Sequence, residues 1–212
     1  MLGNSLLTLF LSGLGLGLIH AFDSDHLVAV SNLSVHKPSL KKTLGDSLHW
    51  AVGHGLVLLI LGLYASFLGL NIPLLVSHWA EIFVGIMLIF LGSWTLYQLY
   101  RELASKFAKN DKHNTKLNNL SKRTPLLVGV IHGTAGSATV LALIPAIQLS
   151  SPVITLSYMV FFAVGVLLSM CVFAVILSHS QQQLAKYSFN FFNLFRAFIG
   201  LFAIVLGALW LL

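Results

Sequence analysis

The chain consists of long apolar runs separated by short polar connections. A helix that spans a bilayer needs about 20 predominantly apolar residues. Six segments have this character, so the sequence predicts six transmembrane helices and an all-α integral membrane protein as the fold class. Their approximate bounds are 6–30, 47–70, 78–100, 125–147, 153–177 and 189–212.

Basic residues gather in the connections after the first, third and fifth of these segments. The positions are Lys37, Lys41, Lys42, Lys106, Lys109, Lys112, Lys116, Lys122 and Lys186. The connections at 71–73 and 150–152 carry no basic residue. Since basic loops stay on the cytoplasmic side, we expect loop 101–123 in the cytoplasm and both termini outside.

Three short motifs occur twice, in the same order. Segments 17–21 and 51–53 resemble 129–133 and 163–165 at an offset of 112 residues (129 − 17), and 85–92 resembles 200–207 at an offset of 115 (200 − 85). Because each copy holds three spans, the second copy must be inverted in the membrane, which is a recurring transporter plan. We therefore expect one permease domain over 1–212, with repeat one at about 1–100, the cytoplasmic loop at about 101–123 and repeat two at about 124–212.

Composition and charge agree with a membrane location. The chain is 57% hydrophobic and only 8% charged, whereas soluble domains have about 25% charged residues. Its net charge of +6 is interpreted as lysines facing anionic lipid rather than nucleic acid. The single cysteine, Cys171, excludes an internal disulfide, a cysteine metal site and a transmembrane dithiol relay. Segment 1–19 has neither a basic start nor a small-residue cleavage site and is predicted to be a retained span of a multi-pass inner-membrane protein.

Ligand-type groups are concentrated in the stretch His20-Ala-Phe-Asp23-Ser-Asp25-His26. Each charged group near a bilayer centre costs about 2.5–3.5 kcal/mol, so the two aspartates together cost roughly 5–7 kcal/mol. Two Asp–His ion pairs that lock helices together would explain part of this pattern. Four ligand groups exceed what one ion pair needs, and they favour a divalent-cation site.

Helical geometry leaves two possibilities for this stretch. At about 100° per residue, His20, Asp23 and His26 share a face about 120° wide, whereas Asp25 falls elsewhere. Either Asp25 orients a histidine from behind the ligands, or the helix is unwound here, which is allowed where the backbone lines a cavity or is buried in protein.

Two further histidines extend the candidate site. His54 lies between Gly53 and Gly55, which would let another backbone approach, and His132 corresponds to His20 in the repeat. Whether Asp46, His49 and Ser137 take part is left open. The predicted metal residues are His20, Asp23, Asp25, His26, His54 and His132. A mixed imidazole and carboxylate set without thiolate indicates a borderline divalent ion.

These motifs resemble a known family. The stretch from His20 to His26 resembles the His-x4-Asp-His signature of the nickel/cobalt transporter family, and 52–55 resembles its second-span segment. The run 129–138 is similar to the corresponding segment of related urease-accessory-type membrane proteins. The resemblance implies a secondary permease for Ni²⁺ or Co²⁺, with His20, Asp25 and His26 in the metal-selecting helix.

Other functions remain as alternatives. They are an exporter of Zn²⁺, Mn²⁺ or Fe²⁺, a transporter of a non-metal solute on a related fold, and an intramembrane metalloenzyme or Ser137–His protease. The absence of His-Glu-x-x-His and Gly-x-Ser-Gly motifs argues against the enzymes. We expect no resident cofactor, with the metal ion as substrate and the lipid bilayer as partner. The oligomeric state is left open, with a homo-oligomer as one option. A further hypothesis is that protons move counter to the metal. Asp25 and His26 would then be the metal-binding pair, and Asp23 would hold the proton or orient a ligand from behind.

Overall fold

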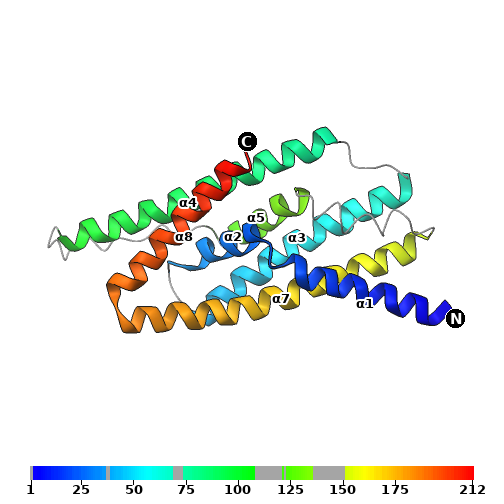
Figure 1. Cartoon of the computed structure of the whole chain (residues 1–212), viewed down its shortest axis with the longest axis horizontal. Coiled ribbons are helices and arrows are strands. Elements are labelled where there is room, and N and C mark those ends of the chain that lie inside the picture. The colour runs from blue at the N-terminus through cyan, green and yellow to red at the C-terminus, as the bar shows by residue number, and fades with distance from the viewer. Residues whose placement is uncertain (1, 37–38, 69–73, 108–120, 122, 136–150) are drawn as a thin grey trace.

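The computed structural model describes all residues except 1, 37–38, 69–73, 108–120, 122 and 136–150. Within the described residues the chain is all-helical and has no strand, as the sequence predicts (Figure 1). The helices are α1 (Leu2–His20), α2 (Ser24–Ser34), α3 (Leu40–Leu68), α4 (Leu74–Phe107), α5 (Thr124–Thr134), α7 (Pro152–Tyr187) and α8 (Phe189–Leu209).

Four of these helices contain segments that are long and apolar enough to cross a membrane: Leu40–Tyr64, His78–Lys106, Pro152–Tyr187 and Phe189–Leu209. Helices α1 and α2 form a fifth span if the pair is taken together, with a bend of 58° between them. Helix α5 has only 11 residues, and the rest of the expected fourth span lies outside the described residues. The chain is thus a multi-pass membrane protein, with four to five of the six expected spans seen in its described part.

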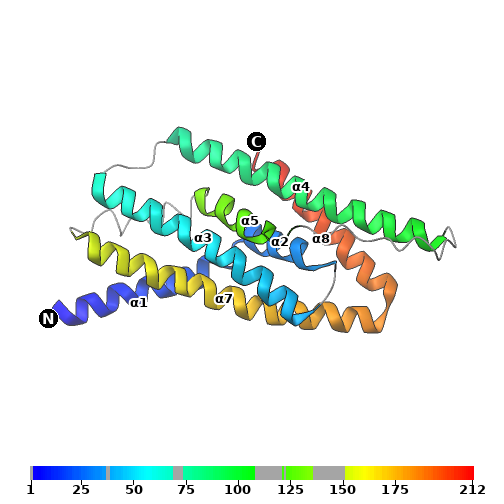
Figure 2. The ribbon, with the colours of Figure 1, turned by 180° about the vertical axis from the view of Figure 1, so that it is seen from behind.

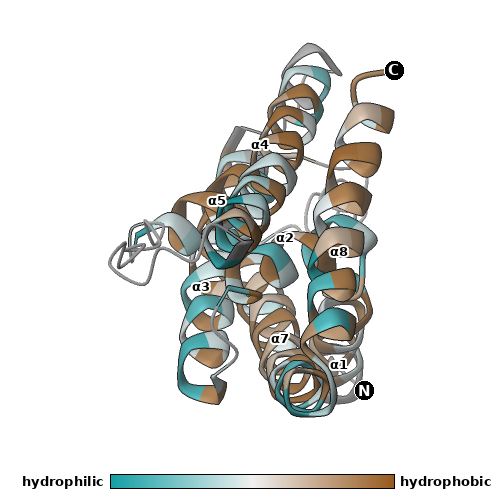
Figure 3. Cartoon of the chain, turned by 90° about the vertical axis from the view of Figure 1, so that its left-hand side faces the viewer, coloured by the Kyte–Doolittle hydropathy of each residue, from teal (hydrophilic) through white to brown (hydrophobic). Residues whose placement is uncertain are grey.

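Long helix pairs surround a short central element. Helices α3 and α7 pack along each other, α1 packs along α7, α5 along α3, and α4 along α8. Helix α2 contacts α3, α4, α5 and α8, so it lies inside the bundle (Figures 1 and 2). Figure 3 shows hydrophilic residues on α2, whereas many residues of α7 and α8 are hydrophobic.

Close helix contacts at glycines occur twice with one offset. A methyl group on Gly17 would collide with the Phe162 carbonyl, and one on Gly129 would collide with the Trp50 carbonyl. Both glycines and both partners are 112 residues apart (129 − 17 and 162 − 50). A second pair follows the same rule: Gly53 lies against Leu126, and Gly165 against Leu14.

The same contacts give the directions of the helices. Gly13 meets Tyr158 and Gly17 meets Phe162, so α1 and α7 run parallel. The Trp50–Gly129 and His54–Gly133 contacts make α3 and α5 parallel, and the Gly55–Ala163 and Gly62–Met159 contacts make α3 and α7 antiparallel. Helices α1 and α5 therefore run in opposite directions.

The expected first span is interrupted directly after His20. Phe22 N–H donates to the Ile19 carbonyl at 3.0 Å, and Asp23 N–H to the His20 carbonyl at 3.1 Å, which tightens the last turn of α1. Asp23 is extended (φ −57°, ψ 141°), and α2 starts at Ser24. Of the two possibilities left by the helical geometry, the unwound helix is confirmed.

Several helices extend beyond the predicted spans. Helix α3 begins at Leu40 instead of 47, α4 continues to Phe107, and α7 continues to Tyr187. His179 therefore lies within α7, and its side chain is exposed. Most of the predicted cytoplasmic loop lies outside the described residues.

Candidate metal centre

Three buried imidazoles meet where the first span is broken. His20 ends α1, His26 lies in the first turn of α2, and His54 lies in the middle of α3. Their exposed fractions are 8%, 3% and 0%. One ligand atom from each lies within 4.8 Å of the others, so the three rings could hold one ion.

Hydrogen bonds fix the orientation of the rings. His20 Nδ1 lies 2.8 Å from Asp23 Oδ2, and His26 Nδ1 lies 3.1 Å from the His20 carbonyl oxygen. His132 Nδ1 lies 3.0 Å from the Val128 carbonyl oxygen. Because carbonyl and carboxylate oxygens only accept, each Nδ1 donates, and the lone pair of each neutral ring is on Nε2. Metal-ligating histidines are held in this way.

Two of the free nitrogens face each other. His20 Nε2 and His54 Nε2 are 3.2 Å apart. With the His20 proton on Nδ1, this contact needs a proton from His54 or a cation shared by both lone pairs. His54 Nδ1 is buried and has no hydrogen-bond partner among the described residues.

Asp25 lies between the rings of His26 and His132. Its Oδ2 is 3.7 Å from His26 Nε2 and 3.8 Å from His132 Nε2. Asp23, Asp25 and His26 also offer ligand atoms within 4.8 Å of one another. Asp25 is buried, whereas the Asp23 side chain is 44% exposed. All six predicted residues are thus close together. One group is His20, His26 and His54, the other is Asp23, Asp25 and His26, and His132 lies beside Asp25.

Trp50 forms one wall of this cluster, a role that the sequence did not reveal. Its ring stacks on His54 at 4.9 Å between centroids and contacts His26 at 4.9 Å and His132 at 5.7 Å. The sequence feature that could have indicated this contact is the position of Trp50, four residues before His54 and thus on the same face of α3.

Two helix C-termini end at the cluster. His20 lies in the last turn of α1 and His132 in the last turn of α5. A helix C-terminus carries roughly half a negative charge. Because α1 and α5 run in opposite directions, their C-terminal ends face each other across the cluster. The partial negative charges of both C-termini therefore favour a cation between them.

The other candidates lie elsewhere. His49 is exposed and hydrogen-bonds to the Gly45 carbonyl at 2.6 Å, whereas Asp46 pairs with Lys42 at 2.5 Å. Neither belongs to the imidazole cluster. Ser137 lies outside the described residues.

The end of the bundle where α2, α4 and α7 finish and α3 and α8 begin is called the basic end here (Figure 1). It carries Lys41 and Lys42 at the start of α3, Lys106 at the end of α4 and Lys186 at the end of α7.

A partly buried ion pair, which the sequence did not indicate, lies near the basic end. Arg196 is 1% exposed, and its Nη1 donates to Glu102 Oε2 at 2.6 Å across α8 and α4. Both ring nitrogens of His36 are also buried. Burial, followed by the charges of Arg196 and Lys42, lowers the pKa of His36 to about 4. His36 is therefore neutral at physiological pH.

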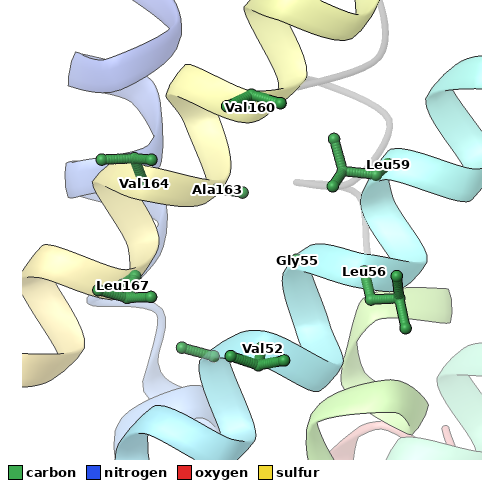
Figure 4. Close-up of a pocket in the computed structure, with 9 residues that line it drawn as sticks. Val52, Gly55, Leu56, Leu59, Val160, Ala163, Val164 and Leu167 are labelled. Atoms are coloured by element: carbon green, nitrogen blue, oxygen red, sulfur yellow. The ribbon is translucent and has the colours of Figure 1, made fainter.

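An apolar groove lies between α3 and α7 (Figure 4). It has a volume of about 260 Å³. The lining residues are Ala51, Val52, Gly55, Leu56, Leu59, Val160, Ala163, Val164 and Leu167. With no polar side chain in its lining, the groove offers nothing that could bind a metal ion.

The apolar helices and the buried polar centre define a multi-pass helical membrane protein. The chain belongs to the family described as the cytochrome c biogenesis protein transmembrane region, which matches residues 9–209. No solved structure matches.

Two curated relatives cover most of the chain. Urease accessory protein UreH of Bacillus sp. (strain TB-90) is 28% identical over 176 residues, which are 81% of this chain and 77% of the relative. The chloroplast protein FOR GROWTH AND FERTILITY 2 of Arabidopsis thaliana is 23% identical over 192 residues, 88% of this chain and 51% of that protein. The resemblance to urease-accessory-type membrane proteins is confirmed, as is the expectation of a membrane permease-type protein rather than an enzyme.

Proposed function

We propose that the chain is a secondary permease for a divalent transition-metal ion, with Ni²⁺ or Co²⁺ as its substrate. The observation that carries this proposal is the convergence of His20, His26 and His54 within 4.8 Å at a broken helix in the bundle interior. Imidazole suits nickel, copper, zinc and cobalt. Within this group, the resemblance of 20–26 to the nickel/cobalt transporter signature favours nickel and cobalt.

The spacing of the nitrogens fits a bound ion. With metal–nitrogen bonds of about 2.0–2.1 Å, two ligands of a tetrahedral ion lie about 3.3 Å apart. His20 Nε2 and His54 Nε2 are 3.2 Å apart. An ion between them would accept both lone pairs and would lie close to the C-terminal ends of α1 and α5.

The proposed architecture is two inverted repeats of three spans, at about 1–100 and 124–212, in an inner membrane. Support comes from the glycine contacts repeated at 112 residues and from the opposite directions of α1 and α5. Six spans would result if the predicted span at 125–147, of which α5 is the described part, crosses the membrane. The site would then lie where the two repeats meet near the midplane, as in other transporters of this plan.

Coupling to protons is part of the proposal. A bound metal needs deprotonated ligands, so binding releases protons. Asp23 pairs with His20 at 2.8 Å and is the most exposed of the six residues, which suits it to exchange a proton with water. Asp25 is buried beside His26 and His132 and is better placed to face the ion.

Export of Zn²⁺, Mn²⁺ or Fe²⁺ is the second candidate. The imidazole cluster suits Zn²⁺ as well as Ni²⁺, whereas Mn²⁺ prefers oxygen ligands. Flux of each ion into vesicles distinguishes these substrates. A solute that is an anion is disfavoured by Asp23 and Asp25.

The test is ion flux into proteoliposomes that contain metal-sensitive and pH-sensitive dyes. Wild-type protein should move Ni²⁺ or Co²⁺ with protons in the opposite direction. His54→Gln should reduce metal flux at least tenfold, since one lost ligand weakens affinity by about that factor or more. His49→Gln, an exposed histidine on the same helix, is the matched control and should leave flux unchanged. Failure of every divalent ion to cross would contradict the proposal.

A further inference from the structure

Four buried oxygen atoms on α2 and α3 have no hydrogen-bond partner among the described residues. They are Asn32 Oδ1, Ser34 Oγ, Thr43 Oγ1 and Ser47 Oγ. Asn32 is 1% exposed and the other three residues are 0% exposed. Buried polar atoms in proteins are nearly always paired, and an unpaired group indicates strain, a functional role, or a water or ion.

The Thr43 and Ser47 hydroxyls do not bond to the backbone carbonyl four residues earlier, which is the usual partner within a helix. A serine or threonine within a helix can donate to the carbonyl four residues earlier. Thr155 and Ser157 on α7 do so, at 3.2 Å to Ser151 and 2.9 Å to Val153. Thr43 and Ser47 have the same option, but their oxygens bond to nothing in the described part of the chain.

These hydroxyls are aligned with the imidazole cluster. Thr43, Ser47, Trp50 and His54 are spaced by 4, 3 and 4 residues, so they occupy one face of α3. All four are 0% exposed. This face therefore leads from the metal centre to the start of α3 at the basic end.

Helix α2 runs beside this face in the opposite direction. Lys42 Nζ donates to the Leu33 carbonyl at 2.9 Å near one end, and His26 contacts Trp50 near the other. Asn32 is thus level with Thr43, and Ser47 lies between them and the cluster. Asn32 and Ser34, two residues apart on α2, point about 200° away from each other, and the Asn32 amide donates to the Ile199 carbonyl on α8 at 3.4 Å. Only Thr43 and Ser47 therefore form a polar strip, along the buried face of α3 that they share with Trp50 and His54.

We propose that this strip, formed by Thr43 and Ser47, lines the passage between the metal centre and the basic end. It would take a partly hydrated divalent cation and its water. This inference rests on the proposed function, since it assigns the route of the same ion. Conduction needs sites that attract an ion weakly enough to release it. Neutral hydroxyl oxygens meet that need, and ordered water can join them when no ion is present.

The first experiment separates flux from binding in reconstituted protein. Ni²⁺ flux and Ni²⁺ affinity are measured for Ser47→Ala, Thr43→Val and the double variant, with Ser157→Ala as the control for a hydroxyl outside the strip. Each strip variant should lower flux about fivefold, the effect of one net hydrogen bond, with affinity changed less than twofold. Unchanged flux in the double variant would overturn the inference.

The second experiment tests the passage without relying on the identity of the ion. Cys171, the only cysteine, is replaced by serine, and Ser47→Cys or Ala203→Cys is added. Ala203 is also 0% exposed but lies on α8, where it packs against Gly92 of α4. A small cationic thiol reagent applied at the basic end during turnover should modify position 47 and spare 203. Equal reactivity at both positions would contradict the passage. Wild-type vesicles that move no metal would instead contradict the proposed function, and the labelling would still decide whether the passage exists.

Discussion

Replacing Gly17 with alanine should separate α1 from α7 and damage the metal centre. The methyl group would meet the Phe162 carbonyl oxygen, which belongs to helix backbone and cannot rotate away. Overpacking of this kind costs about 1–3 kcal/mol. Since His20 is three residues further along α1, the shift would also displace His20 from His54, and Ni²⁺ affinity should fall.

Gly15 provides a matched control two residues away. A methyl group there meets nothing within 4 Å. Gly15→Ala should therefore stabilise the protein by about 0.5–1 kcal/mol, because alanine is the better helix residue. The two variants should change stability in opposite directions.

The assay is unfolding of purified protein in mixed micelles, followed by tryptophan fluorescence, together with Ni²⁺ titration of each variant. Gly129→Ala faces the Trp50 carbonyl in the related position and should behave like Gly17→Ala. Equal stability of Gly17→Ala and Gly15→Ala would refute the reasoning, because it would mean that α1 and α7 are not in close contact at Gly17.

Two further predictions concern the basic end. The folded protein keeps His36 neutral down to about pH 4, whereas the unfolded chain binds a proton near pH 6.5, so stability should fall as pH drops through this window. The loss of stability is at most about 3 kcal/mol. If the unfolding of a His36→Gln variant kept the full wild-type pH dependence, the assignment of this loss to His36 would be contradicted. Glu102→Gln leaves the Arg196 guanidinium buried without its charged partner and should lower the free energy of unfolding by about 2 kcal/mol. This value is smaller than the penalty for breaking a fully buried ion pair, because the Glu102 side chain is 30% exposed. The double variant with Arg196→Met should recover most of that loss in the same unfolding assay, and no recovery would argue against the ion pair.

The composition of the candidate site could be predicted because charge at membrane depth is costly. Asp23 and Asp25 stood out within an apolar run, and His132 was found through its repeat relation to His20. The exact route of the backbone could not be predicted. The break at 21–23 contains neither glycine nor proline, and the contacts there include bonds from Asp23 and His26 to His20.

Trp50 and Arg196 show what the sequence pattern does not contain. Tryptophan in an apolar span is typical of packing, and only the fold brings Trp50 against three histidines. Arg196 lies close to the predicted start of the last span, where a basic residue is ordinary. Its partner Glu102 is 94 residues earlier in the chain, and no local pattern joins the two.

The central claim is that His20, His26 and His54 bind a transported metal ion. Nickel K-edge X-ray absorption of the purified, Ni²⁺-loaded protein tests it most directly, because scattering from imidazole rings counts the histidine ligands. The account predicts two to three imidazoles at about 2.0–2.1 Å, with one fewer in His54→Gln and no change in His49→Gln. A spectrum without imidazole scattering, or one that His54→Gln leaves unchanged, would contradict the account.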